Sequence, residues 1–233
     1  GLEYAADGLT KRLLGQGTSG SVLFRAHGLT ERLHTASGSS LTRQKLRTLI
    51  LASETLVGKL PEELLLSDTH GHHFHVAPRH FSEHVLLSLL LTVGDGKLDN
   101  YIVPDASVAS QQGYALVAID NDRCFFPALV KKPGALGHVP YMRCFLFLLP
   151  QMHTPIAPEV RAHFLDLAFE RLILEWLADV ARYNSAFEGY QAAGLFSAPD
   201  LAGKRVPVTF LAGTFKALSL RWQTMQRILA EPK

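Results

Sequence analysis

Three polar side chains stand where two apolar runs of the sequence end, and their types and spacing could do chemistry. Asp95 and Asn100 follow the apolar run His84–Val93, and Asp120 follows the run "YALVAI" twenty residues after Asn100. A carboxylate can accept the proton of an attacking hydroxyl. An amide oxygen and a second carboxylate are ligands that a hard divalent cation prefers. The three residues therefore indicate a general base beside a bound cation.

A glycine-rich run near the start of the chain is a second candidate site. Residues 15–22 read Gly-Gln-Gly-Thr-Ser-Gly-Ser-Val, with apolar residues on both sides, which predicts strand, glycine turn and strand over residues 10–26. Glycines let backbone N–H groups approach phosphate oxygens without a Cβ in the way. The spacing is that of a kinase phosphate loop, and a plain hairpin is the alternative. The candidate nucleotide-binding residues are Gly15, Gly17, Thr18, Ser19, Gly20 and Val22.

The separation of Asp95 and Asn100 carries further information. It is five residues, which is the separation of the base aspartate and the metal-binding asparagine in a kinase catalytic loop. The alternative is a turn that ends a helix, because Gly94 and Gly96 flank Asp95. For Asp120 the alternative is a turn at a strand end. A hairpin between the two apolar strands would bring Asn100 and Asp120 to one end, which favours the chemical interpretation.

Both segments resemble a known family. "GDGKLDNYIV" (residues 94–103) and "AIDNDRCFFP" (residues 118–127) are similar to the catalytic and metal-binding loops of the phosphatidylinositol 3- and 4-kinases, within the protein kinase-like superfamily. The second segment looks most like that of the type II phosphatidylinositol 4-kinases. The resemblance covers about residues 13–127 and is specific at these two loops.

The resemblance implies a function and roles for the residues. It implies a phosphotransferase that uses ATP and Mg, with a phosphoinositide or a protein hydroxyl as acceptor. Asp95 would be the catalytic base, and Asn100 and Asp120 the magnesium ligands. Glu54, on a helix expected over residues 41–58, would be the ion-pairing glutamate of the front lobe. Residues 73–78 would be the strand that leads into the segment that holds adenine.

One departure from the family pattern concerns a lysine. A kinase needs a lysine in the strand after the glycine loop to bind phosphates, and residues 22–38 contain none. A cation from elsewhere, such as Lys11, could take its place. The alternative is a pseudokinase that serves as a nucleotide-regulated binding or scaffolding module, or that catalyses a transfer other than that of a kinase.

The order of the expected elements predicts an α+β protein with a two-lobed, protein kinase-like fold. Residues 1–78 would form a strand-rich N-lobe with the glycine loop, and residues 79–233 a mainly helical C-lobe with the catalytic and metal-binding loops. The remaining expected elements are strands at 61–68, 72–78, 100–103, 114–120 and 205–213, and helices at 82–92, 141–183 (with a break near 150–158) and 214–229.

Composition limits the partners and the compartment. The net charge is only +2 with no long run of Lys and Arg, so we expect no nucleic-acid partner. Two cysteines make no disulfide framework, which is compatible with the cytoplasm or another reducing compartment. The longest apolar run is shorter than the roughly 20 residues that span a bilayer, and the first residues lack a signal-peptide layout. Lys131 and Lys132 could attract an anionic headgroup, which would allow peripheral membrane contact, or an acidic peptide. A solvated loop is the alternative.

Overall fold

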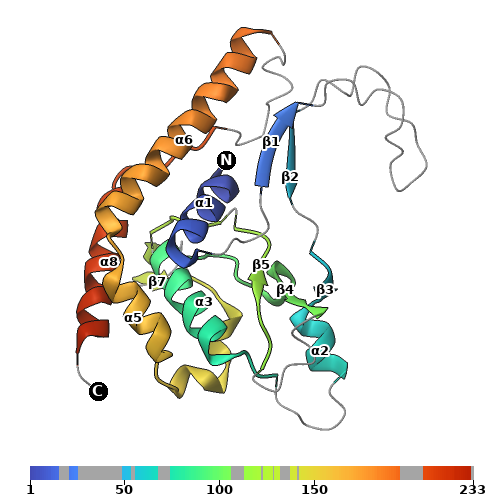
Figure 1. Ribbon diagram of the computed structural model, residues 1–233, viewed down its shortest axis with the longest axis vertical. Coiled ribbons are helices and arrows are strands. Elements are labelled where there is room, and N and C mark those ends of the chain that lie inside the picture. Colours follow the sequence, from blue (N-terminus) through green and yellow to red (C-terminus); the bar gives the residue numbers. More distant parts are fainter. Residues whose placement is uncertain are drawn as a thin grey trace.

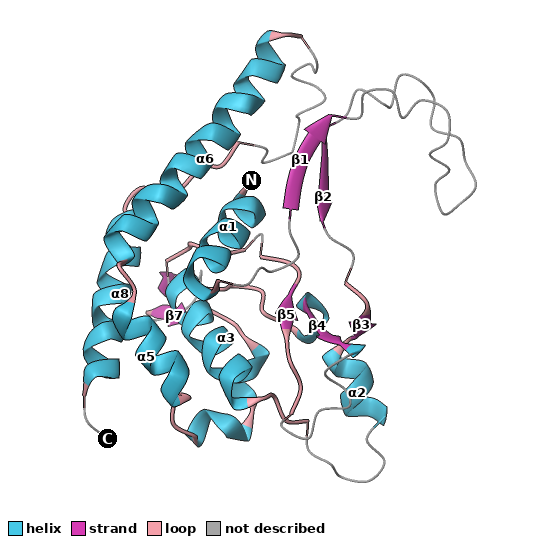
Figure 2. Cartoon of the chain, viewed as in Figure 1, coloured by secondary structure: helices cyan, strands magenta, loops and turns pink. Residues whose placement is uncertain are grey.

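The computed structural model has a mixed α+β fold, in which helices surround the larger of two cores and most of the short antiparallel strands lie to one side. Figure 2 shows the helices in cyan and the strands in magenta. The residues that the structure describes are 1–15, 21–25, 49–53, 56–67, 74–105, 113–121, 123–127, 129–131, 137–140, 142–194 and 207–231.

The helices are labelled as in Figure 1. The α-helices are α1 (Leu2–Leu14), α2 (Pro61–Ser67), α3 (Pro78–Leu91), α5 (Pro158–Asp166), α6 (Phe169–Ala192) and α8 (Thr214–Ala230). The 3₁₀ helices are η2 (Leu98–Asn100), η3 (Phe145–Leu148) and η4 (Pro150–His153). The expected helix at 214–229 is thus confirmed. The helical region expected over residues 141–183 is confirmed from Pro158 onward by α5 and α6. Before it, residues 142–149 contain only η3, and η4 lies inside the expected break. The helix expected at 82–92 is present and begins earlier, at Pro78, because proline suits the first helical position.

Within the described residues the strands form three small antiparallel sheets. They are β1 (Ser21–Arg25) with β2 (Leu49–Ser53), then β3 (Gly58–Lys59), β4 (Tyr101–Pro104) and β5 (Val117–Ala118) in one sheet, and β6 (Leu129–Lys131) with β7 (His138–Pro140). The expected pairing of the strand after Asn100 with the strand before Asp120 is confirmed by β4 and β5.

The larger hydrophobic core lies among α1, α3, α5, α6 and α8. Leu90 of α3, Phe164 of α5 and Trp176 of α6 are fully buried in it. Almost every residue from Phe81 to Leu91 is buried, so α3 is enclosed around its circumference, as expected of a central helix. α3 is therefore fixed by packing on several sides before the chain leaves it at residue 92.

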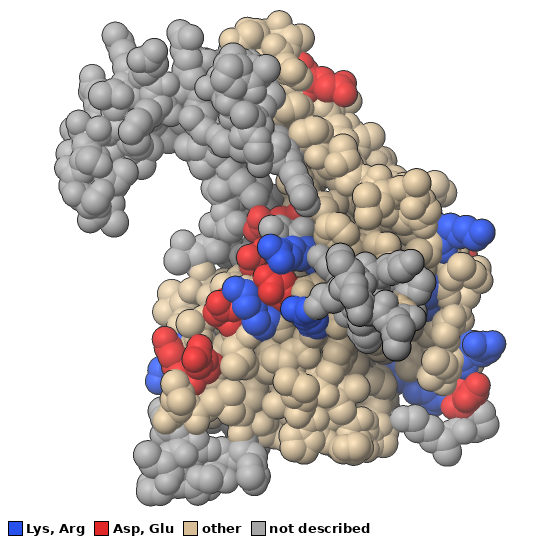
Figure 3. All heavy atoms as spheres, turned by 180° about the vertical axis from the view of Figure 1, so that it is seen from behind, with Lys and Arg blue, Asp and Glu red and all other residues tan. Residues whose placement is uncertain are grey.

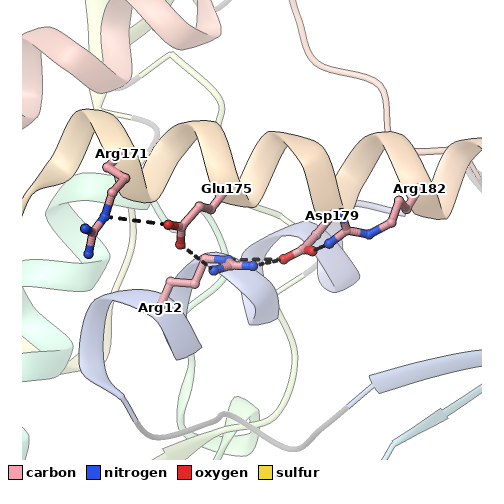
Figure 4. Close-up of polar contacts among 5 residues, drawn as sticks. All are labelled: Arg12, Arg171, Glu175, Asp179 and Arg182. Atoms are coloured by element: carbon pink, nitrogen blue, oxygen red, sulfur yellow. Dashed lines mark hydrogen bonds and ion pairs between the residues drawn. The ribbon is translucent and has the colours of Figure 1, made fainter.

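Helix α1 is joined to α6 by an ion-pair network (Figure 4). The Arg12 guanidinium donates to Asp179 and, at 3.1 Å, to the Oε2 of Glu175. Arg171 and Arg182 pair with the same two carboxylates from within α6. A planar guanidinium suits such shared recognition of carboxylates. The network fixes the end of α1 that leads into the glycine run.

Two further contacts hold the first half of α1. The indole Nε1 of Trp176 donates to the Ala5 carbonyl at 2.8 Å, and the rings of Tyr4 and Tyr183 stack with centroids 4.2 Å apart. The N-terminal residues 2–14, which the sequence assigns to the N-lobe, therefore share a core with helices assigned to the C-lobe. The boundary at residue 78 stays a prediction.

A second, smaller core supports the three-stranded sheet. Tyr101 and Val103 of β4 are buried in this core. They lie there with Leu64 of α2, Leu146 of η3, and Val76, which precedes α3. Because this core reaches from α2 to η3, it ties the segment after Asn100 to parts of the chain that lie far away in sequence.

Two of the expected strands are helices in the structure. Residues 10–14 belong to α1 and not to a strand, because Ala5, Leu9 and Leu13 recur at helical spacing on its buried face. Residues 61–67 form α2 and not a strand. Pro61 at the first helical position followed by Glu62 is a helix-start signal that outweighs the apolar run after it.

The helix expected over residues 41–58 is wrong wherever that range is described. Leu49–Ser53 form β2, and Gly58–Lys59 form β3. A short run such as Leu-Ile-Leu-Ala fits a buried helix or a strand equally well, and pairing with β1 selects the strand. Glu54 lies outside the described residues, so its role stays a prediction.

The expected strand at 205–213 is not found in the part of it that the structure describes, residues 207–213, which form a turn and extended coil. Among the described residues, no helix is both long enough and apolar enough to cross a membrane.

Candidate functional site

The candidate catalytic loop begins where α3 ends. Thr92 adopts a left-handed conformation with φ of 51°, and its N–H donates to the Ser88 carbonyl. The Thr92 hydroxyl lies 2.6 Å from the carbonyl oxygen of Phe126, and Arg221 of α8 donates to the Leu90 carbonyl at 2.8 Å. The carbonyls of Leu90 and Leu91 thus receive donors from other segments, Arg221 and the Phe125 N–H, and the direction in which the chain leaves the helix is fixed.

The loop then runs between two other segments that hold its backbone. The Gly94 N–H donates to the Arg123 carbonyl, the Gly96 N–H donates to the Arg143 carbonyl, and the Phe145 N–H donates to the Gly96 carbonyl, each at 2.8 Å. A Cβ on Gly96 would lie 2.9 Å from the Arg143 carbonyl oxygen. The close approach therefore requires glycine at this position, and Asp95 sits between two anchored neighbours.

Asn100 closes the loop from the other end. Its Nδ2 donates to the backbone carbonyl of Asp95 at 2.5 Å, and its side chain is buried. Its own N–H donates to the Lys97 carbonyl at 3.1 Å, and its carbonyl accepts the Ile119 N–H at 3.0 Å. Since the amide nitrogen is committed to Asp95, the Oδ1 is the side-chain atom through which Asn100 could bind a cation.

The pairing of β4 with β5 brings Asp120 to Asn100. In this antiparallel register Tyr101 is opposite Ala118. One residue further along, Asn100 is joined to Ile119 by a backbone hydrogen bond. Asp120 is the next residue and is exposed. The structure therefore brings together the three residues that the sequence selects, Asp95, Asn100 and Asp120.

Lys97 is a residue of this site that the sequence interpretation missed. Its Nζ lies 3.1 Å from the Oδ2 of Asp99. Its pKa is raised, first by the hydrogen bond and charge of Asp99 and then by the charges of Asp95 and Asp120. Its position two residues after Asp95 was the sequence signal that could have identified it. Figure 3 shows acidic and basic side chains side by side near the middle of the rear face.

A buried polar group supports the loop from beneath. The Sγ of Cys144 lies 3.4 Å from the Ser88 hydroxyl and 3.4 Å from the Tyr101 hydroxyl. The backbone of Cys144 pairs with Gly96. The pKa of the Tyr101 phenol is raised well above its ordinary value by burial and then by Cys144. The phenol is therefore neutral and acts as a structural hydrogen-bonding group.

The glycine-rich run is described only at its two ends. Gly15 ends α1 in the left-handed conformation, with φ of 66°, and Val22 lies in β1. Gly17, Thr18, Ser19 and Gly20 lie outside the described residues. The run thus follows a helix and precedes a strand, whereas the sequence predicted a strand on each side.

Residues 74–77, expected to lead into an adenine-binding segment, use their backbone groups within the chain. The Val76 N–H donates to the Gln151 Oε1 at 2.9 Å, and the Gln151 Nε2 donates to the Val76 carbonyl at 2.7 Å. On the other side Tyr114 bonds the carbonyl of His75 and the N–H of Ala77. These groups are not available to hold a base.

The donor chemistry of the site fits a hard cation. Among the described residues, no three His, Cys, Asp or Glu side chains group closely enough to hold a metal by themselves. Magnesium in phosphotransfer sites is held by one or two carboxylates together with phosphate oxygens. Asp120 and the Oδ1 of Asn100 could supply the protein part of such a set.

No protein-family model matches the sequence, and no curated protein is significantly similar to it.

Proposed function

We propose that this protein is an ATP- and magnesium-dependent phosphotransferase of the phosphatidylinositol kinase-like type. It transfers the γ-phosphoryl group to a hydroxyl of a lipid or a protein. In this proposal the β1–β2 hairpin and the glycine run form the smaller lobe of a two-lobed kinase-like fold, and α3 with its surrounding helices forms the larger one.

The observation that carries the proposal is the convergence at Asn100. This residue bonds the backbone of Asp95 on one side and that of Ile119, next to Asp120, on the other. A helix-ending turn alone would not require a buried asparagine that also joins a second strand. The arrangement is what a base and a cation site within one centre need.

Each residue has a defined role in this proposal. Asp95 accepts the proton of the attacking hydroxyl while its neighbours keep it in place. Asn100 and Asp120 hold the magnesium ion, which when bound neutralises phosphate charge. Catalysis then rests on position and charge rather than on covalent chemistry by the protein.

Lys97 supplies the cation that the strand after the glycine run lacks. Lys11, the substitute considered from the sequence, pairs with Asp7 in its own helix at 2.8 Å. Lys97 pairs with Asp99, but both side chains are about half exposed. Such an exposed pair contributes little stability, so a phosphate group can replace Asp99 at small cost.

The adenine contact is assigned to the connection between β2 and β3, because residues 74–77 are occupied within the chain. This connection joins the hairpin to the sheet that carries the catalytic loop. Val57 is 74% exposed there and offers an apolar side chain to one face of a base.

Binding of ATP with magnesium is the first test. A ligand at ten times its Kd stabilises the folded state by about 1.4 kcal/mol, which raises the Tm of a chain of this size by about 3–6 °C. The same nucleotide without magnesium, and the Asp120→Asn variant with it, should give smaller shifts. An unchanged Tm at millimolar nucleotide would refute the proposal.

Turnover of ATP is the second test and separates two functions. Asp95→Asn keeps the side-chain size and should lower turnover by about 10²–10⁴-fold, as expected for a lost general base, while leaving the thermal shift intact. The second candidate function is a pseudokinase module, which the missing strand lysine favours. Binding of nucleotide without turnover in the wild type would select it.

A further inference from the structure

Helix α8 differs from α6, the longest helix described, in its charge. Its 17 residues contain Lys216, Arg221 and Arg227 and no Asp or Glu. Helix α6 contains four acidic residues and two arginines, and both arginines are paired. In the described part of the chain, no ion pair involves Lys216 or Arg227. These two side chains therefore present positive charge that is free to pair with a partner.

Lys216 lies where a helix tolerates a positive charge least well. Gly213 is the N-cap of α8, so Lys216 belongs to the first turn. The backbone N–H groups of that turn form the positive end of the helix dipole, which favours acidic side chains and disfavours cations. A residue that breaks such a local rule without a compensating contact points to a role other than the stability of the helix.

The two cations flank an exposed leucine on one face of α8. Lys216, Leu220 and Arg227 are spaced by four and seven residues, and at about 100° per residue these positions lie within about 40° of one another. All three side chains are exposed, that of Leu220 to 53%, and Ile228, 58% exposed, borders them. These four residues are here called the basic face. α8 exposes three large apolar side chains, whereas the longer α6 exposes one.

The opposite side of α8 is anchored. The ring of Trp222 stacks on that of Phe169 of α6, with centroids 4.2 Å apart, and the Gln226 Nε2 donates to the Phe164 carbonyl of α5 at 2.9 Å. Figure 1 shows α8, in red, at the side of the molecule opposite β1 and β2. The basic face is therefore presented by a fixed helix, well away from the β1–β2 hairpin.

We propose that the basic face binds an acidic amphipathic helix of a partner protein. Carboxylates of the partner pair with Lys216 and Arg227, and apolar side chains between those carboxylates cover Leu220 and Ile228. The two cations are eleven residues apart, which the helical rise converts to about 16 Å. A partner helix with two acidic residues at the same spacing meets both cations at once. This binding does not depend on phosphotransfer, so either proposal stands if the other fails.

The composition of the basic face favours a protein partner over nucleic acid. A nucleic-acid strand carries a phosphate about every 3.4 Å, so two cations about 16 Å apart would neutralise few of them. The apolar side chains between the cations have no counterpart in a phosphate backbone. They match the apolar residues of an amphipathic helix, which are buried when the two helices pack.

Fluorescence anisotropy with a labelled helical peptide tests the proposal on the full chain. The peptide has about 16 residues, enough to lie along the face, with two glutamates eleven residues apart and leucines between them. The same peptide with glutamines in place of the glutamates should bind about tenfold more weakly, since two ion pairs are lost. Leu220→Ser should weaken binding of the glutamate peptide at least tenfold. Leu174→Ser, which alters a 68% exposed leucine of α6, should bind it like the wild type.

Lys216→Glu separates recognition from a structural role, because its two expected effects have opposite directions. A glutamate in the first turn suits the helix dipole, so the urea midpoint should rise. Binding of the glutamate peptide should fall about fivefold, because an attraction becomes a repulsion. Lys59→Glu is the matched control, since it reverses the charge of an exposed lysine on β3, and it should leave peptide binding unchanged.

Four results would overturn the proposal. They are no binding of the glutamate peptide, equal binding of the two peptides, equal loss in Leu220→Ser and Leu174→Ser, and equal loss in Lys216→Glu and Lys59→Glu. A wild type that self-associates in sedimentation-velocity runs, with Leu220→Ser monomeric, would assign the face to a second copy instead. Should Leu220→Ser alter the circular dichroism spectrum, Arg227→Gln replaces it, with an expected loss of about threefold in binding.

Discussion

Substitution of Gly96 by alanine tests whether the candidate catalytic loop is held as described. The added Cβ would lie 2.9 Å from the Arg143 carbonyl oxygen and 3.1 Å from the Cα of Cys144. Both neighbours are backbone atoms that cannot move aside by a rotamer change. Forcing extra atoms into such a contact costs about 1–3 kcal/mol, which lowers the Tm by about 2–12 °C in a chain of this size.

Urea unfolding followed by circular dichroism measures this cost, and Gly189→Ala is the matched control. Gly189 lies inside α6, and a Cβ added there would meet no neighbouring atom within 4 Å. Alanine there should stabilise the protein by up to about 1 kcal/mol, because it favours the helix. Equal stability of Gly96→Ala and the wild type would show that the loop does not run between Arg143 and Arg123 as the structure has it.

Three further outcomes are expected. The pKa of His84 is lowered, first by burial, so its neutral form is favoured in the folded state. The stability that depends on this residue is fully present above the unfolded pKa of about 6.5 and is lost as the pH falls through the lower folded value. His84→Gln should flatten that loss in urea titrations between neutral and acidic pH, and an unaltered profile would contradict the assignment. Arg12→Met should lower the free energy of unfolding by about 1 kcal/mol, since the pairs with Glu175 and Asp179 are partly exposed; a difference within error would remove the network from the stability of α1. Lys97→Met should lower ATP turnover at least tenfold without changing the urea midpoint, and Lys59→Met, which alters a lysine on the exposed β3 strand, is its control; equal turnover in the two variants would exclude Lys97 from the site.

The parts of the fold that sequence reasoning predicted are those with one dominant signal. α8 has a clear helical period, and β4 and β5 are apolar runs on either side of a polar loop. β2 was expected to be part of a helix and α2 to be a strand, because both segments are short and apolar. Over so few residues, period alone does not distinguish the two structures. Pairing with β1 makes β2 a strand, and Pro61 and Glu62 in the first turn make α2 a helix.

The candidate site was predicted as a set of residues but not as a structure. Spacing selected Asp95, Asn100 and Asp120, and the strand pairing brings them together. Lys97 was missed because a lysine in an exposed turn is common, and only its position among the carboxylates distinguishes it. The segment at Val76 was assigned to base binding because nothing in the local sequence shows that Gln151 occupies its backbone groups.

The loop around Gly96 is held by residues that lie beyond the segment that resembles the kinase family. The family resemblance ends near residue 127, yet Gly96 is held by Arg143 and Phe145. Cys144, between them, supplies the sulfur that Ser88 and Tyr101 contact. Because buried polar groups left without partners cost free energy, a chain that ended before this segment would expose the supports of its own catalytic loop. The resemblance therefore selects the candidate reacting groups of the proposed function, while residues beyond it hold their loop in place.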